Sequence, residues 1–277
     1  LCHVQERLAA HVLQTPGRLL GTALLASLLT LPLQAAEEQK DSAPAARLEP
    51  RALDVLKAMS ARLAAAEAMS FKAVTFYEKP SRLGPPLAYA TVAQVALQRP
   101  NRLRVLTSGD GPASEFYFNG KQAIAFAPAE NLLAVADAPP TIDAMLEAAY
   151  QRAAIYFPFT DVIVADPYAD MARDMRLAFY IGQSRAVGGT TTDVIAYANN
   201  EVFVQAWIGS KDKLPRKLRA VFRDDPAQLR HQVSFSHWKL NSAMPDSFFQ
   251  PSAADKAQRI EFDPPVVRPD KQSKSKP

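Results

Sequence analysis

The sequence is poor in the residues that build many known sites. It has one cysteine, Cys2, in 277 residues, and only ten glycines. A single cysteine excludes a disulfide-stapled secreted scaffold. Beyond residue 36 the only histidines are His231 and His237, which are too far apart on one strand to share a metal. No Cys pair, His-Glu-x-x-His motif or phosphate-binding glycine loop is present. We therefore expect no catalytic residues, no metal site, no cofactor and no enzyme activity.

Charge of one sign is also lacking over most of the chain. The whole chain has a formal charge of +4 and a pI near 9.1. The excess comes from residues 1–36 and 264–277, and the body from 37 to 263 is neutral. A neutral body does not present the basic face that nucleic acid requires. We therefore expect no nucleic-acid partner.

The first 36 residues resemble a secretory signal rather than part of a fold. Arg7 and Arg18 precede an apolar run over 19–33, and small residues follow at Ala35 and Ala36. The run is shorter than the about 20 apolar residues of a membrane span. This order predicts a periplasmic protein that is exported with cleavage near Ala35 or Ala36 and keeps no stable membrane span. An uncleaved anchor is the alternative.

The remaining chain divides by composition into three parts. Residues 37–49 form a polar linker, and residues 50–263 have the mixed apolar and polar content of a single domain. Residues 264–277 are rich in Pro, Lys and Ser, which predicts a disordered basic tail. The fold must therefore be sought in the central part.

Period-two alternation predicts strands through most of this part. Between 202 and 222, two strand-like runs flank a polar turn, and Leu218, Ala220 and Phe222 alternate with Lys217 and Arg219. Such segments, bounded by turn residues, give about eleven strands at hairpin spacing. Other examples are 70–79, 88–98, 102–108, 132–136, 177–187, 190–197 and 231–240.

Helical patterns occur at the start and in the middle of the domain. An apolar stripe of period three to four predicts a helix over 51–68. A second helix is expected from 140 to 152 with Thr141 as its N-cap. Two shorter helical pieces follow over 157–165 and 166–173, and Asp166 before Pro167 reads as the start of the second. The fold class is therefore α+β, mainly β: a curved antiparallel sheet forming a half-barrel, with helices covering the hollow.

The sharpest local signal is Asn119-Gly120 between two apolar runs. This dipeptide predicts a type I′ hairpin turn. That turn would place Phe118 opposite Lys121 and Phe116 opposite Ala123.

The aromatic side chains on the strands suggest a ligand-binding hollow, because apolar linings make ligand pockets. Ordinary core packing is the alternative for each residue taken singly. Several strands also carry apolar residues on both faces, so both faces would be covered or one would meet a partner. The candidate cavity-lining residues are Phe116, Phe118, Phe179, Trp207, Leu218, Phe222 and Phe235.

Several short segments together resemble a family of predicted periplasmic bacterial proteins of unknown function. They span residues 50 to 262 and include Arg99-Pro100-Asn101-Arg102-Leu103-Arg104, Phe116-Tyr117-Phe118-Asn119-Gly120-Lys121, Asp166-Pro167-Tyr168, Leu214-Pro215-Arg216-Lys217-Leu218 and Pro245-Asp246-Ser247-Phe248-Phe249. The family is similar to the lipoprotein carriers LolA and LolB and to the N-terminal domain of RseB. The resemblance implies an eleven-stranded half-barrel whose helices close an apolar cavity for acyl chains. It assigns no ligand-binding residue in this sequence.

The combined observations predict a periplasmic binding protein that holds a lipid acyl chain or a lipoprotein in its hollow. One alternative is an envelope sensor or scaffold that binds other proteins, as apolar residues on both faces of a strand would allow. A metal-independent hydrolase is the second alternative, because catalytic partners can be distant in sequence.

Overall fold

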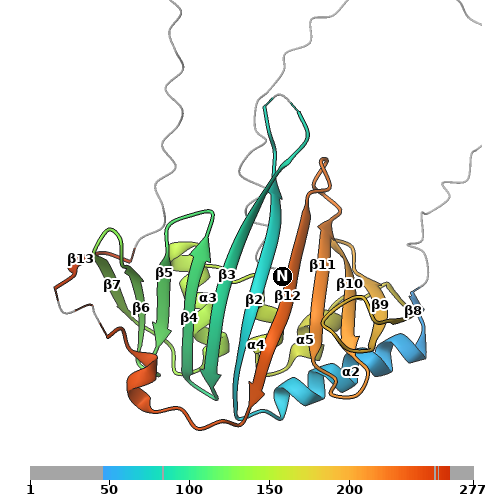
Figure 1. Ribbon diagram of the computed structural model, residues 1–277, viewed down its shortest axis with the longest axis horizontal. Helices are drawn as coiled ribbons and strands as arrows, with labels where there is room; N and C mark the ends of the chain where they lie inside the picture. The colour runs from blue at the N-terminus through green and yellow to red at the C-terminus, as the bar shows by residue number, and fades with distance from the viewer. Residues whose placement is uncertain (1–45, 83, 253, 255, 263–277) are drawn as a thin grey trace, which may run out of the picture.

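The computed structural model describes residues 46–82, 84–252, 254 and 256–262. The predicted signal segment and basic tail lie outside these residues. The described chain forms one curved, unclosed sheet of 13 strands with helices on it (Figure 1). The helices are α2 (Pro50–Ala64), α3 (Ile142–Ala153), α4 (Thr160–Ile163) and α5 (Pro167–Ala172), with the 3-10 helix η1 (Asp246–Phe249).

The strands follow the predicted segments closely. They are β1 (Arg47–Leu48), β2 (Ala68–Lys79), β3 (Leu87–Gln98), β4 (Arg102–Gly109), β5 (Ser114–Phe118), β6 (Gln122–Ala127), β7 (Leu132–Asp137), β8 (Leu177–Ser184), β9 (Thr192–Ala198), β10 (Val202–Gly209), β11 (Pro215–Phe222), β12 (Arg230–Leu240) and β13 (Gln258–Ile260). The mainly β fold class is confirmed.

The strand order is β1-β8-β9-β10-β11-β12-β2-β3-β4-β5-β6-β7-β13. Every neighbouring pair among β2 to β12 is antiparallel, so the eleven expected strands are present. The two short edge strands are parallel additions that the sequence did not predict. Arg47 and Leu48, placed in the linker from the sequence, belong to the sheet.

The connection from β7 to β8 determines how the sheet is covered. These strands are consecutive in the chain but lie near opposite ends of the sheet. The insert between them, residues 138–176, therefore crosses the sheet and carries α3, α4 and α5 (Figure 1). We call the face that packs against the helices the inner face. Its core joins Phe116 of β5 and Ile195 of β9 to Met145 and Phe159 of the insert.

The N-cap residues of α3 and α5 are the ones predicted from the sequence. The Thr141 hydroxyl accepts a hydrogen bond from the Ala144 amide at 3.3 Å. The Asp166 carboxylate accepts one from the Ala169 amide at 3.0 Å. Each side chain satisfies an amide that the helix itself leaves unpaired, so both predicted helix starts are confirmed.

The opposite face, the outer face, has a second cluster at one end of the sheet. Tyr117, Ile124, Phe126 and Leu133 form it, and Ala254 and Ala257 pack against it. These alanines belong to the C-terminal strap, residues 241–262, which runs from β12 past η1 to β13 at the far edge (Figure 1). The chain thus covers this end of the outer face with its own C-terminal segment.

The hairpin turn at Asn119-Gly120 differs from the expected one. Phe118 lies opposite Ala123, not Lys121, so the connection is wider than two residues. Gly120 has a φ of +89°, whereas Asn119 is absent from the positive-φ residues of the described chain. The Asn119 side-chain oxygen accepts hydrogen bonds from the amides of Lys121 and Gln122. This local side-chain bonding replaces the type I′ geometry.

We predict that Gly120→Val lowers the free energy of unfolding by about 1–3 kcal/mol. Gly120 has a left-handed φ, and a Cβ there would lie 2.5 Å from Arg102 Nη1. Gly111→Val is the matched control, because a Cβ at Gly111 has no neighbour within 4 Å. Denaturant unfolding measures both variants. Equal stability of Gly120→Val and Gly111→Val would contradict the turn described here.

Candidate functional site

The inner face is filled by the protein's own side chains. The Phe157 ring lies 5.3 Å from that of Phe116, and the Phe159 ring lies 5.8 Å from that of Phe71. The two insert rings also stack on each other at 5.6 Å. Aromatic pairs at these distances stabilise beyond the burial of their area. The insert therefore occupies the hollow that the sequence predicted to be open.

The predicted lining residues divide between the two faces. Phe116, Phe118, Leu218 and Phe235 lie in the inner-face core, and Phe222 packs against it half-buried. The remaining two, Phe179 and Trp207, alternate with inner-face residues and so point to the outer face. We expected both side chains to line the hollow on the inner face. Because their strands carry apolar residues on both faces, the sequence pattern did not show which face each side chain occupies. A ligand-lining role for the other five stays a prediction.

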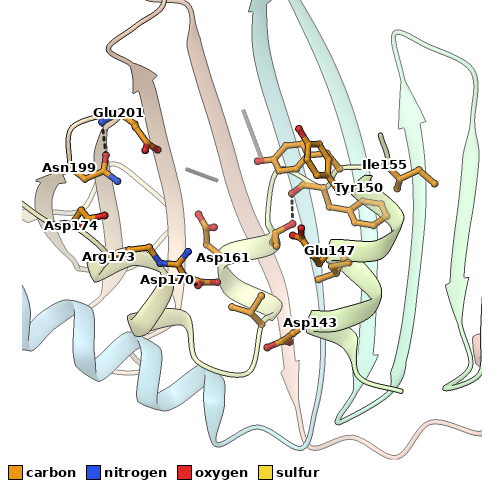
Figure 2. A pocket seen from close by; sticks show the side chains of 15 residues that line it. Asp143, Glu147, Tyr150, Ile155, Asp161, Asp170, Arg173, Asp174, Asn199 and Glu201 are labelled. Carbon is orange, nitrogen blue, oxygen red and sulfur yellow. Dashed lines mark hydrogen bonds and ion pairs between the residues drawn. The ribbon is translucent and has the colours of Figure 1, made fainter. Parts of the chain in front are cut away.

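A pocket of about 300 Å³ lies between the insert helices and the turn that joins β9 to β10. Figure 2 shows its labelled side chains coming from α3, α4, the end of α5 and that turn. Its apolar lining includes Leu146, Ile155, Phe157 and Val164. Because Phe157 also belongs to the inner-face core, the pocket reaches the side chains that fill the hollow.

The rest of the pocket lining is strongly acidic. Asp161 is only 6% exposed, and the single cation, Arg173, pairs with Asp170 at 2.9 Å. Burial raises the pKa of the Asp170 carboxyl; Arg173 opposes the rise and the charge of Asp161 adds to it. The pocket therefore favours uncharged or cationic groups over anions. The lining carboxylates are those of Asp143, Glu147, Asp161, Asp170, Asp174 and Glu201.

Three polar contacts order the wall of this pocket: two lie within the insert, and one joins the insert to the turn between β3 and β4. The Asp143 carboxylate accepts from the Ala165 amide, which joins the start of α3 to the chain after α4. Arg99, in the turn between β3 and β4, donates to the Val164 carbonyl at 2.9 Å. The Thr160 hydroxyl donates to the Phe157 carbonyl at 2.8 Å.

A second feature of the inner face is a row of rings on neighbouring strands. Tyr77 stacks with Tyr89 at 5.7 Å and with His231 at 6.5 Å, and Phe222 meets His231 edge to face at 5.6 Å. Burial lowers the pKa of the His231 imidazole, and the charge of Lys79 lowers it further. Asp225 and Glu78 oppose this shift. The folded protein therefore favours neutral His231.

Sequence reasoning missed the carboxylates of the pocket, because they come from four separate segments. Asp143 and Glu147 lie one turn apart on α3, which puts them on one side of that helix. The acid-rich stretch around Asp161, Asp170 and Asp174 was the second signal. Neither signal predicts a pocket by itself, because the carboxylates come together only when the insert crosses the sheet.

The described residues contain no group of three or more His, Cys, Asp or Glu side chains placed to hold a metal ion. None of the described helices is long and apolar enough to cross a membrane. The expectations of no cofactor and no enzyme activity stay predictions.

The chain belongs to the family described as "Predicted periplasmic protein (DUF2092)", whose model matches residues 52–263. The family and the periplasmic location expected from the sequence are confirmed. No curated protein sequence matches the chain.

Several solved structures are similar to parts of this chain. LprF from Mycobacterium bovis is 15% identical, with 72% of this chain and 97% of that chain covered and a TM-score of 0.44. The MucA/MucB complex of Pseudomonas aeruginosa is 17% identical, with 76% and 64% covered and a TM-score of 0.42. The LolA superfamily protein NE2245 from Nitrosomonas europaea is 12% identical, with 72% and 97% covered and a TM-score of 0.32. At these values no residue role or ligand is transferred.

We predict that His231→Gln flattens the loss of thermal stability between pH 7 and pH 5. A histidine with a lowered folded pKa contributes its stability above the unfolded value of 6.5, and this contribution is lost as the pH falls below that value. Glutamine does not titrate in this range. Calorimetry across the pH range tests this, with His237→Gln as the control for removing a histidine outside the row. A wild-type slope that survives His231→Gln would refute the assignment.

Proposed function

We propose that this member of the periplasmic family is a binding protein that shelters an acyl chain of a lipid or lipoprotein against the inner face. The observation that supports this most directly is the pocket of about 300 Å³ that reaches Phe157 and the inner-face core. Its volume lies at the lower end of the range for small-molecule sites. A longer chain would extend the pocket by displacing apolar side chains of the insert.

The insert is suited to such displacement. Its helices α4 and α5 have only four and six residues, too short to be stable without packing. Phe157 and Phe159 contact the sheet through ring surfaces. Methylene groups of an acyl chain offer the same sheet residues equivalent apolar contact. The ligand would therefore take the place of side chains rather than fill a permanent void.

The acidic lining makes the proposal more specific. A free fatty acid would bring its carboxylate close to acidic lining residues such as Glu147 and Asp161, and repulsion would weaken binding. An ester-linked or amide-linked acyl chain has no such charge. The acyl chains of intact lipids and lipoproteins are linked in this way, whereas free fatty acids are not.

We predict that a long-chain acyl methyl ester binds more tightly than the free acid of equal length at pH 7. The difference should be about tenfold and should shrink in high salt, because the repulsion is electrostatic. Competition against a fluorescent acyl probe measures both affinities on the purified mature protein. Tighter binding of the free acid would contradict the specificity, and absence of any acyl binding or co-purified lipid would leave the scaffold alternative as the better account.

We further predict that Phe157→Leu shifts the preferred acyl length upward. The smaller side chain enlarges the apolar end of the pocket, and the stability loss should be about 1–2 kcal/mol. Phe76→Leu is the matched control, since Phe76 lies on the outer face with 51% of its surface exposed. A series of esters of increasing length, measured on folded variants, gives the readout. The same length profile in all three proteins would mean that Phe157 does not border the acyl chain.

A further inference from the structure

The outer face is covered over only part of its width. The C-terminal strap packs on the cluster at β5 to β7, whereas the outer face of β8 to β11 has no covering element in the described chain. At this end Phe179 is 36% exposed and Ile181 is 50% exposed. Large exposed apolar side chains that adjoin one another mark interaction surfaces more often than single ones do.

The strand register groups the outer-face residues of this end. Trp207 lies opposite Lys217, Gln205 opposite Arg219, and Phe203 opposite Val221. The Lys217 ammonium lies 5.6 Å from the centroid of the Trp207 ring, a cation–π distance. The small residues of β9 between Phe179 and these rings are buried. We call the set Phe179, Phe203, Trp207, Val221, Lys217 and Arg219 the outer aromatic patch.

The charge of the patch has one sign. Lys217 and Arg219 adjoin the rings, and the described outer-face residues of β8 to β11 include no acid. Glu78 of β2 is bound by Arg230 and also feels the charge of Arg219, so Lys217 is the cation of the patch without an acidic neighbour among these strands. A partner that covers the patch therefore needs both apolar surface and negative charge.

The C-terminal strap shows how this protein covers a surface of that kind. Asp246 of η1 lies 3.8 Å from Arg102 on the outer side of β4. The Phe248 ring lies 4.1 Å from the Arg104 guanidinium carbon, and Phe249 beside it is fully buried. Asp246 and Phe248 of the strap thus contact the two arginines on the outer side of β4 within the same molecule.

We propose that the outer aromatic patch binds an acidic segment of another envelope protein that carries at least one aromatic residue. The segment would place carboxylates at Lys217 and Arg219 and its ring beside Trp207. Phe203 and Trp207 are half-buried and so do not project as membrane anchors do. This interaction is separate from the acyl pocket, which lies on the inner face.

The test begins with a random peptide library selected on the immobilised mature protein. We expect the enriched peptides to combine Asp or Glu with an aromatic residue. Their affinity for Lys217→Glu and for Arg219→Glu should fall by at least about tenfold. Both positions are on the solvent side of β11, and circular dichroism checks that the variants are folded. Lys121→Glu, an exposed lysine in the turn after β5, is the matched control and should bind normally.

A charge swap makes the assignment specific. Peptides in which Lys replaces the acids should bind Lys217→Glu better than they bind the wild type. Acyl-ester binding should be equal in these variants and the wild type, which separates this proposal from the acyl one. The proposal is wrong if acidic aromatic peptides are not enriched, or if their affinity survives charge reversal. It is also wrong if Lys217→Glu and Arg219→Glu change only the binding of anionic vesicles or the self-association of the protein, and not the binding of peptides.

Discussion

The structure depends on one topological constraint: β7 and β8 are consecutive in the chain but lie near opposite ends of an open sheet. The segment between them must cross the sheet, and it crosses on the inner face. It brings Phe157, Phe159, Val162 and Ile163 onto the strands. Burial of these side chains closes the core, and the edges of the same crossing segment form the acidic pocket. Fold and candidate site therefore have the same origin.

Much of the fold follows from local sequence. The antiparallel strands could be predicted from the alternation around Leu218 and Phe222 and from the spacing of turns. The starts of the insert helices could be predicted from the capping residues Thr141 and Asp166. Strand faces were harder to assign. The run around Trp207 has apolar residues on both sides, so period two does not say which side is inner. The parallel edge strands and the filled hollow depend on contacts between distant segments, which no local pattern encodes.

The two faces of the sheet have different chemistry, and this separates the two proposed interactions. The inner face is apolar under an acidic cover, which suits an uncharged acyl chain. The outer face near β10 and β11 combines rings with Lys217 and Arg219, which suits an acidic protein segment. If both proposals hold, the protein can bind a lipid group on its inner face while its outer face stays accessible to a partner.

The proposed function requires an acyl chain to take the place of insert side chains on the inner face. Hydrogen–deuterium exchange with and without a saturating acyl methyl ester tests it most directly, because it reports local opening residue by residue. Exchange should change over 155–175 and in the strands beneath, while exchange in the strap over 245–260 should stay the same. Unchanged exchange over 155–175 with the ester bound would contradict it.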